Sequence, residues 1–513
     1  MATRSAQALK KLSLKPRYGP FIGGKIPVHN PANGDLLSTV TSTSAEQANE
    51  AVNLAHETFK EGKWSRAPAI QRSLVLGKMA RSLEKRIPEL AELESLQTGR
   101  AIREMRAQLS RVPEWLDYYA ALLRVHSGFV APTQGPLLNY VNRIPLGVVV
   151  QITPFNHPLL IALKKIGPAL AAGNSVIVKP SEQAPLTVLE FAEMALEAGL
   201  PPSVLTVLTG AGPELGRTLV SHPLVKKVDV TAGTNTGRAI GSLAGSNLAS
   251  YTAELGGKAP VVVFEDADIA AAVNGVAFAA FIASGQTCVS ATRLLVHESI
   301  YDEFMARLVE KVDKITKGMG DPLNPQSTMG TVISPASLER VAAAVRKSNR
   351  KILIGGEKMN GVSSLDGFDF SMGSFFAPTI VEDVGVEDEL WKEEVFGPVL
   401  AVAKFENERH AVSLANDCKY GLGAGLWTQD LSRAHRIANE LESGLVWVNT
   451  HHRNDPSSPW GGMKESGIGR ENGIEAFESY SQSKSIIINV AQMDHARNTD
   501  DWFNAVDGNR RYG

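Results

Sequence analysis

Cysteine is scarce in this chain: only Cys288 and Cys418 occur in 513 residues. Two thiols cannot build a disulfide framework or a zinc site of several thiolates, and both suit a reducing compartment. An excess of charge of one sign is also lacking, because 52 basic residues against 54 acidic ones leave a formal net charge of -2. A nearly neutral chain has no broad attraction for nucleic acids or membrane surfaces.

Long apolar runs are missing as well, so no segment is expected to span a membrane. Residues 1–18 carry five basic side chains and no acidic one. That pattern occurs in mitochondrial presequences, although a disordered N-terminal arm is the more common explanation. We therefore expect a cytoplasmic protein that binds no nucleic acid, membrane or metal ion. Its length allows two or three domains.

Residues 147–255 alternate short apolar runs with helical patterns. Strands are predicted at 147–152, 175–178, 204–208 and 227–230, with helices between them. Uninterrupted apolar residues indicate strands buried on both faces, which is typical of a parallel, doubly wound α/β sheet. The helical patterns at 44–59, 69–86, 88–98 and 101–123 are assigned to the same domain, which covers 18–125 and 147–255.

A second alternation of strand and helix patterns begins near Gly256 and predicts a second α/β domain over 256–455. The β-rich stretch 484–490 has no partner near it in sequence. We expect it to pair with 139–143 and form a protruding arm, from 126–146 and 480–492, of the kind that makes oligomer contacts. Flexible tails are predicted at 1–17 and 493–513.

Cys288 lies at the end of an apolar helical pattern, where Ser284 and Gly285 break the helix. This setting suits a reactive thiol, although a free cysteine is more often a small buried hydrophobe. A thiolate that attacks a carbonyl needs oxyanion donors and a base. Asn156, in a turn after a predicted strand, can supply an amide donor, and Glu254 can act as a general base. Taken alone, a glutamate is more often a salt-bridge partner.

Three glycine clusters are candidates for a phosphate-binding loop. The cluster 210–216 misses the dinucleotide spacing by one residue, and 421–426 precedes a strand instead of a helix. The third, 228–238, has strand, turn and helix in the required order, so its helix amides could hold a pyrophosphate. Lys179 and Glu182 follow a neighbouring strand, where a carboxylate can bind ribose hydroxyls and repel a 2′-phosphate.

Together these residues resemble the NAD(P)-dependent, non-acylating aldehyde dehydrogenase superfamily. The E-L-G-G, G-Q-x-C and P-W-N-F-P patterns match 254–260, 285–288 and 154–158. The E-E-x-F-G-P pattern matches 393–399, and a long glycine-rich block matches 458–473 with Trp460 in place of Phe. The resemblance covers about residues 20–490. It implies a dinucleotide-binding domain, a catalytic domain and a β-arm for homodimers or homotetramers.

The resemblance also implies roles for single residues. Cys288 would be the nucleophile, Asn156 and the Cys288 amide the oxyanion donors, Glu254 the base for water, and Lys165 a proton-relay residue. Oxidation of an aldehyde to its acid would run through a thiohemiacetal and a thioester, with NAD preferred and NADP possible. The implied cofactor residues are Ile152, Thr153, Pro154, Phe155, Lys179, Ser181, Glu182, Gly212, Gly233, Thr234, Gly237, Leu255, Gly256, Glu394 and Phe396.

The substrate tunnel implied by the family departs from the usual pattern, because His157 replaces an aromatic residue. Its predicted lining is His157, Ile161, Lys164, Thr287, Val289, His452, Arg453 and Trp460. A polar to basic mouth would favour an aldehyde with a carboxylate, hydroxyl or phenol group. The alternative is that Lys164 and Arg453 point to solvent. Two further hypotheses are a semialdehyde dehydrogenase of narrow specificity and a catalytically silent relative with a structural or binding role.

Overall fold

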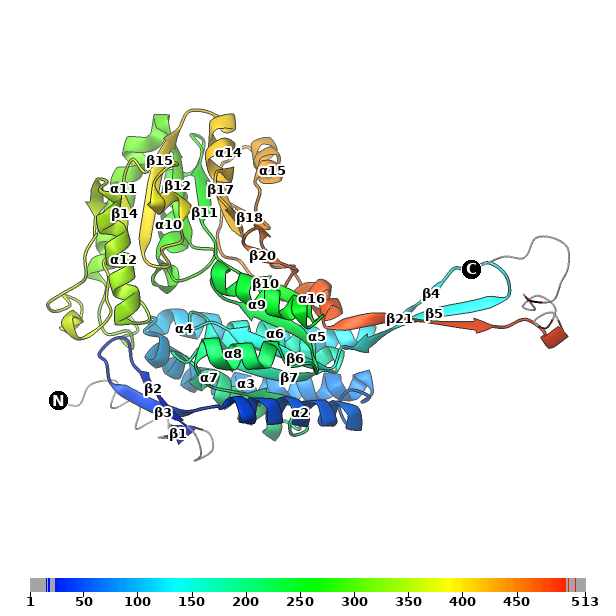
Figure 1. Cartoon of the computed structure of the whole chain (residues 1–513). Helices are drawn as coiled ribbons and strands as arrows, with labels where there is room; N and C mark the ends of the chain where they lie inside the picture. The colour runs from blue at the N-terminus through cyan, green and yellow to red at the C-terminus, as the bar shows by residue number, and fades with distance from the viewer. Residues whose placement is uncertain (1–14, 16, 19–23, 495–496, 498–502, 504–513) are drawn as a thin grey trace.

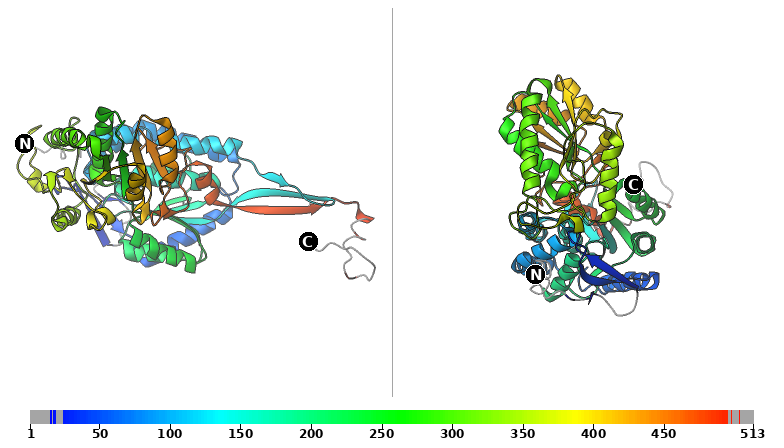
Figure 2. Two further views of the ribbon diagram at one scale, coloured as in Figure 1. Left: turned by 90° about the horizontal axis from the view of Figure 1, so that it is seen from above. Right: turned by 90° about the vertical axis from the view of Figure 1, so that its left-hand side faces the viewer.

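The computed structural model describes residues 15, 17–18, 24–494, 497 and 503. The presequence-like stretch and most of both predicted tails lie outside these residues. Figures 1 and 2 show two α/β bodies, one above the other, and a narrow arm that extends from the lower one. None of the described helices is long and apolar enough to cross a membrane.

The lower body begins with a small sheet in the order β1 (Arg17–Tyr18), β3 (Leu36–Ser42), β2 (Gly24–His29). Helix α2 (Ala45–Glu61) follows, and its start is fixed because Ser44 forms a capping box with Gln47. Next come α3 (Ala69–Thr98), α4 (Ile102–Leu109) and α5 (Pro113–Val125). The two patterns at 69–98 form one helix through Pro88, whereas the predicted helix 101–123 is divided before Pro113.

The first large sheet has the order β20-β10-β9-β6-β7-β8, and all its neighbours are parallel except β20. The predicted doubly wound sheet is thereby confirmed. Its chain order reverses between β6 and β9, the switch point where such sheets bind ligands. Its elements are β6 (Val148–Thr153), α6 (Pro158–Ala172), β7 (Ser175–Pro180), α7 (Leu186–Glu197), β8 (Leu205–Val207), α8 (Gly212–Val220), β9 (Val225–Thr231), α9 (Thr234–Ser246), β10 (Ser250–Glu254) and β20 (Gly467–Ile468).

The second large sheet has the order β13-β14-β15-β12-β11-β17-β18 and forms the centre of the upper body in Figure 1. Only β13 runs antiparallel to its neighbour. Its strands are β11 (Ala259–Val263), β12 (Ala291–His297), β13 (Ile352–Ile354), β14 (Thr379–Val381), β15 (Val399–Phe405), β17 (Gly423–Trp427) and β18 (Leu445–Val448). Its helices are α10 (Ile269–Phe281), α11 (Tyr301–Lys317), α12 (Pro335–Ser348), α13 (Glu389–Lys392), α14 (Glu408–Asn416) and α15 (Leu431–Glu440).

Short elements complete the chain. Three 3-10 turns, at Ile282–Gly285, Glu298–Ile300 and Phe370–Met372, accompany the upper sheet. Strands β16 (Tyr420–Gly421) and β19 (Met463–Lys464) form a separate antiparallel pair. The glycine-rich stretch 421–426, expected to precede a strand, is itself mostly strand, because it contains the end of β16 and most of β17.

The arm contains β4 (Phe129–Ala131), β5 (Leu137–Pro145) and β21 (Ser481–Asn489), with α16 (Gly473–Ser479) at its base. The predicted pairing is confirmed: β21 runs antiparallel to β5, with Ser485 opposite Val141. Strand β4 adds a third member to this sheet. Large apolar side chains are exposed along it, among them Phe129 and Ile487.

The cores follow from the strand sequences. All six residues of β7 and all five of β11 are buried, because helices cover both faces of each sheet. One face of the lower sheet packs against α3, α5, α6 and α7, and the other packs against α2, α8 and α9. These layers leave the strand ends at the junction of the two bodies free to carry polar side chains.

Candidate active site

The candidate site lies where strands of the lower sheet end and strands of the upper sheet begin. Strand β10 ends at Glu254 and β11 begins at Ala259, so the glycine link 256–257 crosses directly between the two sheets. A Cβ on Gly257 would lie 1.9 Å from the carbonyl oxygen of Cys288. The loop that carries the thiol therefore packs against the segment that carries Glu254.

The loop that carries Cys288, the predicted nucleophile, has a strained backbone. Helix α10 ends at Phe281, and Ala283, Ser284 and Gly285 then all adopt positive φ values, of 53°, 54° and 70°. The predicted helix break is confirmed, and it begins at Ile282. A Cβ on Gly285 would lie 2.1 Å from Gly397 O, so only glycine fits this turn. Strain of this kind concentrates at functional sites.

Cys288 is a half-buried free thiol. Burial, followed by the nearby charge of Glu254, raises its pKa to about 12. Asn156 is buried and donates from Nδ2 to Gln286 O at 2.8 Å, which holds its amide against the nucleophile loop. The structure thus brings the predicted nucleophile and the predicted oxyanion donor into one loop cluster.

Glu254 is 2% exposed, and neither carboxylate oxygen has a hydrogen-bond partner within the described part of the chain. Burial, reinforced by the charge of Glu471, raises its pKa well above the ordinary value. A carboxyl group with a raised pKa and two unused oxygens is suited to take a proton from water.

A buried charge cluster lies beside Glu254. Lys165 contacts Asp229 Oδ1 and Glu471 Oε1 at 2.5 Å each, and Lys164 contacts Glu471 Oε2 at 2.7 Å. Burial opposes the charge on Lys165, but the two carboxylates outweigh it and raise the pKa of Lys165. Burial likewise opposes the charge on Glu471, but the two lysines lower its pKa to about 2. Lys165 and Glu471 are therefore both charged at neutral pH.

Glu471 was not among the residues predicted from sequence. The sequence feature that could have pointed to Glu471 is its position in the block 458–473, which matches the family pattern. Strand β20 of that block pairs with β10, with Gly467 opposite Glu254, and this pairing carries Glu471 to the charge cluster. Asp229, on β9, was not predicted from sequence either.

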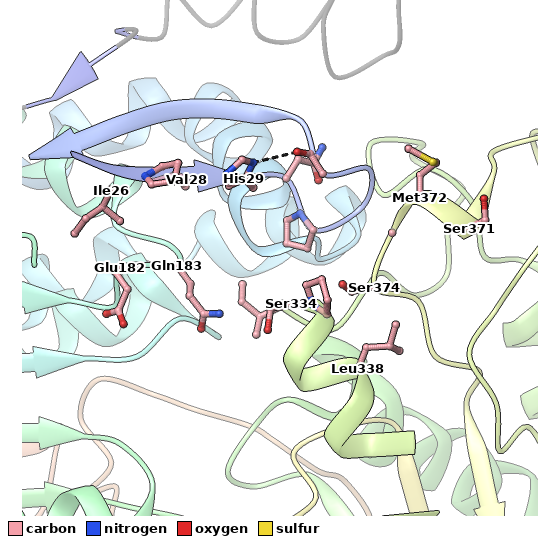
Figure 3. A pocket seen from close by; sticks show the side chains of 17 residues that line it. Ile26, Val28, His29, Glu182, Gln183, Ser334, Leu338, Ser371, Met372 and Ser374 are labelled. Carbon is pink, nitrogen blue, oxygen red and sulfur yellow. Dashed lines mark hydrogen bonds between the residues drawn. The ribbon is translucent and has the colours of Figure 1, made fainter. Parts of the chain in front are cut away.

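The predicted cofactor residues line the ends of β6, β7, β9 and β10. Buried Lys179 donates to Pro180 O at 3.0 Å and lies 3.6 Å from Glu182, while burial lowers its pKa. Ser181 accepts the amide of Gln183. Glu182 also lines a cavity of about 580 Å³ between β2 and the start of α12, shown in Figure 3.

The start of α9 is open to an anion. Gly233 is its N-cap, no side chain caps the helix, and a Cβ on Gly233 would meet nothing within 4 Å. Free helix amides and this open space fit a pyrophosphate. By contrast, a Cβ on Gly237 would lie 2.3 Å from Leu255 Cδ2, so that glycine is needed for packing. Gly212 begins α8, one helix earlier.

The remaining cofactor residues surround the glycine link. Glu394 accepts the amide of Gly257 at 3.1 Å, and a Cβ on Gly256 would lie 2.7 Å from its Oε2. Burial raises the pKa of Glu394 to about 7. Phe396 has a φ of 53° and packs edge-on against Phe155, with ring centroids 5.8 Å apart. Ile152 and Pro154, which are half-buried, and Thr153, which is buried, belong to the same predicted set and lie at the end of β6.

Most of the predicted tunnel residues are buried. Lys164 does not point to solvent: its Nζ lies 4.4 Å from the ring centroid of Trp460, and its charge is balanced by Glu471. Arg453 is exposed, as the alternative expected. His452 is half-buried, and burial followed by the charge of His451 lowers its pKa to about 3. The remaining buried members are His157, Ile161, Thr287, Val289 and Trp460.

A cavity of about 210 Å³ adjoins these tunnel residues. Its lining includes Arg100, Gln108, Arg111, Trp115, Leu160 and His452. Arg100 is buried and paired with Glu104 at 3.1 Å, and its Nη1 donates to Asn156 O at 3.1 Å. Arg100 was not among the residues predicted from sequence, because its contact with Asn156 depends on how the segments before α4 and α6 pack.

Comparisons with known proteins agree with this geometry. The Aldehyde dehydrogenase family pattern matches residues 21–486. A (Z)-2-((N-methylformamido)methylene)-5-hydroxybutyrolactone dehydrogenase of Acinetobacter baylyi is 39% identical over 469 residues, 90% of this chain and 94% of that protein. The chain therefore belongs to the aldehyde dehydrogenase family and is an oxidoreductase that acts on aldehydes.

Solved structures show the same likeness. Betaine aldehyde dehydrogenase from Staphylococcus aureus, in complex with NAD+, is 34% identical with a TM-score of 0.92, over 98% of this chain and 99% of that one. An NAD-dependent aldehyde dehydrogenase from Sinorhizobium meliloti is also 34% identical, with a TM-score of 0.90 over 96% and 98%. These matches confirm the predicted fold class.

Substitution of Gly257 by alanine tests the packing of the glycine link. The new methyl group would overlap Cys288 O, and we expect a shift of the nucleophile loop that lowers kcat/KM on any aldehyde by about 100-fold. Gly245→Ala is the matched control. It also replaces a glycine by alanine, but within helix α9, where the added Cβ meets nothing within 4 Å. Full activity in Gly257→Ala would contradict the packing argument.

Proposed function

We propose that this protein oxidises an aldehyde to the carboxylic acid with NAD, by nucleophilic catalysis at Cys288 and hydrolysis assisted by Glu254. The observation that carries the proposal is the junction of the two sheets. There the thiol loop, the Asn156 amide and an unpartnered Glu254 carboxylate converge, and the open start of α9 follows β9, the strand that pairs with β10.

In this mechanism the Cys288 thiol, which burial keeps protonated at rest, passes its proton to Glu254 as the sulfur adds to the aldehyde carbon. Glu254 releases this proton before the hydrolysis step. The oxygen of the resulting thiohemiacetal then accepts hydrogen bonds from Asn156 Nδ2 and the Cys288 amide, and one such donor contributes about 3 kcal/mol to transition-state stabilisation. A nicotinamide held by the predicted cofactor residues would accept the hydride of the adduct, which would leave a thioester on Cys288. Glu254 then takes a proton from water, the hydroxide attacks the thioester, and the acid and the thiolate separate.

We infer that 18–125 and 147–255 hold the dinucleotide and that 256–455 supply the thiol. The buried charge cluster provides a path for the proton that Glu254 takes from water. Lys165 and Glu471 are buried, charged and coupled to Glu254, so they connect the base to groups further inside the lower body. The lysine predicted for proton relay thus acts together with Glu471.

We propose NAD in preference to NADP because the Glu182 carboxylate, paired with Lys179, lies where it can bind both ribose hydroxyls and repel a 2′-phosphate. Glu182→Gln is expected to lower kcat/KM with NAD by about 10-fold, the value of a hydrogen bond to a charged group, and to lower it less with NADP. Steady-state rates with both cofactors measure the ratio. An unchanged ratio would remove Glu182 from cofactor selection.

The direct test of function is reduction of NAD over a panel of short aliphatic, long aliphatic, aromatic and carboxylate-bearing aldehydes. We expect turnover of at least one class with production of the acid. An absence of turnover on every aldehyde with either cofactor would favour a silent relative with a structural or binding role.

We also propose that the protein acts as a homo-oligomer in the cytoplasm. The arm offers the long strand β21 and exposed apolar side chains, a natural contact between subunits. Light scattering after size-exclusion chromatography would give the mass in solution, and a monomer would overturn the oligomer proposal.

A further inference from the structure

The two lysines whose charges act on Glu254 are both bound by other carboxylates. Lys165 Nζ donates to Asp229 Oδ1 and to Glu471 Oε1 at 2.5 Å each. Lys164 Nζ lies 2.7 Å from Glu471 Oε2. Glu254 is the third carboxyl group of this cluster, and neither of its oxygens is bonded within the described part of the chain. Two carboxylates thus match the two lysines, and the base is left without an ion pair.

Asp229 is fixed in place through both of its oxygens. The residue is 2% exposed, and its Oδ2 accepts the hydroxyl of Tyr480 at 2.5 Å. Gln151, which lies opposite Asp229 in the pairing of β6 with β9, donates to that hydroxyl at 3.2 Å. The same Nε2 of Gln151 donates to Lys165 O at 2.8 Å. The Asp229 carboxylate is therefore a rigid anchor for the Lys165 ammonium.

The charges of the cluster act on Glu254 in opposite directions. Burial is the main cause of its raised pKa, Glu471 and Asp229 raise it further, and the two lysines oppose them. A neighbouring negative charge disfavours the ionised carboxylate, whereas a positive one favours it. Without Asp229, Lys165 would have a spare N–H and less of its charge would be balanced. Glu254, with two unused oxygens, would then be its acceptor.

We infer that Asp229 is a positioning residue for the base: by occupying Lys165 it denies Glu254 an ion pair, and so keeps this carboxyl group basic enough to take a proton from water. The inference deepens the proposed function and rests on it. It also separates the roles of the two carboxylates in the cluster, because Glu471 binds both lysines and Asp229 binds Lys165 alone.

Further titratable groups face the cluster from neighbouring elements: Tyr119 on α5, Lys227 on β9, Tyr251 on β10, the Cys288 thiol and Tyr480 after α16. Burial raises the pKa of the three tyrosines and of the thiol, so these groups stay neutral up to pH 9. Burial lowers the pKa of Lys227 to about 8, and its Nζ donates to Thr252 Oγ1 at 2.6 Å. A pH limb caused by Lys227 would persist in Glu254→Gln, which is therefore the control for it.

The experiment compares the pH profile of Asp229→Asn with that of the wild type between about pH 5 and pH 9. The substrate is whichever of propanal, benzaldehyde and 4-oxobutanoate the wild type oxidises fastest. Asparagine keeps the shape of aspartate and still accepts the Tyr480 hydroxyl. The rising limb of the steady-state rate should move to lower pH, so the ratio of the rate at pH 6 to that at pH 9 rises by about 10-fold, the effect of one neighbouring charge. The rate at pH 9 should fall by about 10-fold, because Glu254 is then a weaker base.

Further variants distinguish a charge effect from a structural one. Asp229→Asn combined with Lys165→Gln removes both members of the ion pair, so the limb should return toward that of the wild type. In Lys165→Gln alone the limb should lie at higher pH, because Asp229 then acts unopposed. This pair of variants keeps the test available if Asp229→Asn fails to fold. Asp266→Asn is the matched control, since it removes an aspartate that binds Arg433 at 2.8 Å in the upper body, and it should leave the limb in place.

The outcomes separate the inference from the function on which it rests. A limb that stays in place or moves to higher pH in Asp229→Asn, with activity lost equally at every pH, would overturn the role of Asp229 and leave aldehyde oxidation standing. A double variant whose limb lies at or above that of Lys165→Gln would do the same. Wild-type enzyme that oxidises no aldehyde would overturn the proposed function and the inference together.

Discussion

Replacement of Cys288 by alanine is expected to abolish aldehyde oxidation, with a loss in kcat of about 1,000-fold or more, because no covalent adduct can form. The lower sheet and the start of α9 are untouched by the change, so binding of NAD should persist. The variant therefore separates chemistry from cofactor binding. Steady-state NADH formation and NAD binding by fluorescence, measured on the same preparation, give the two quantities.

The chain offers a matched control in Cys418, its other free thiol. Cys418 lies in a loop beside β16, and its carbonyl oxygen accepts Lys464 Nζ at 3.1 Å, a contact that alanine keeps. Cys418→Ala should retain wild-type activity. Loss of activity in Cys418→Ala with retention in Cys288→Ala would reverse the assignment of the nucleophile.

The sequence was a good guide to the parts of the fold that depend on local pattern. Strand β7 was predicted because it has consecutive apolar β-branched residues, and such a run suits only a strand buried on both faces. Helix limits were less predictable. Pro88 removes one backbone hydrogen bond and is exposed, but the buried residues Leu83 and Leu90 on either side anchor α3, so the helix continues through it.

Some residues of the candidate site could be predicted from sequence, and others could not. Asn156, Glu254 and Cys288 could be placed from sequence because each follows or precedes a predicted strand or helix end. Glu471 could not, since only the pairing of β20 with β10 carries it to Lys164 and Lys165. The burial of Lys164 depends on that partner, which is why local pattern left its direction open. The contact of His157 Nδ1 with Arg100 likewise depends on the link between α3 and α4, which lies far away in the sequence.

Glu254→Gln is expected to leave the first half-reaction working and to stop the second. A thioester should still form on Cys288, but water would no longer lose a proton to the carboxylate. Stopped-flow absorbance should show a burst of about one NADH per active site, the fingerprint of an accumulating acyl-enzyme. The steady-state rate after the burst should be lower by about 100- to 10,000-fold.

The pH dependence gives a second signature of Glu254. Burial raises its pKa well above the ordinary value, and the base is active when deprotonated, so wild-type deacylation should speed up as pH rises through this raised pKa. The glutamine variant should lack that limb. A burst-free time course, or a pH limb that persists in Glu254→Gln, would assign the base to another group.

Glu254→Gln should also change stability in a direction that follows from the same pKa. A carboxyl group whose pKa is higher in the folded protein favours the fold in its protonated form, so its stabilising contribution is complete below the unfolded pKa and is lost as pH rises through the folded pKa. Glutamine stays neutral and fits the same space. The variant should therefore melt above the wild type at pH 8, with the difference shrinking toward pH 4, and a lower Tm at pH 8 would show that the carboxylate has a stabilising partner after all.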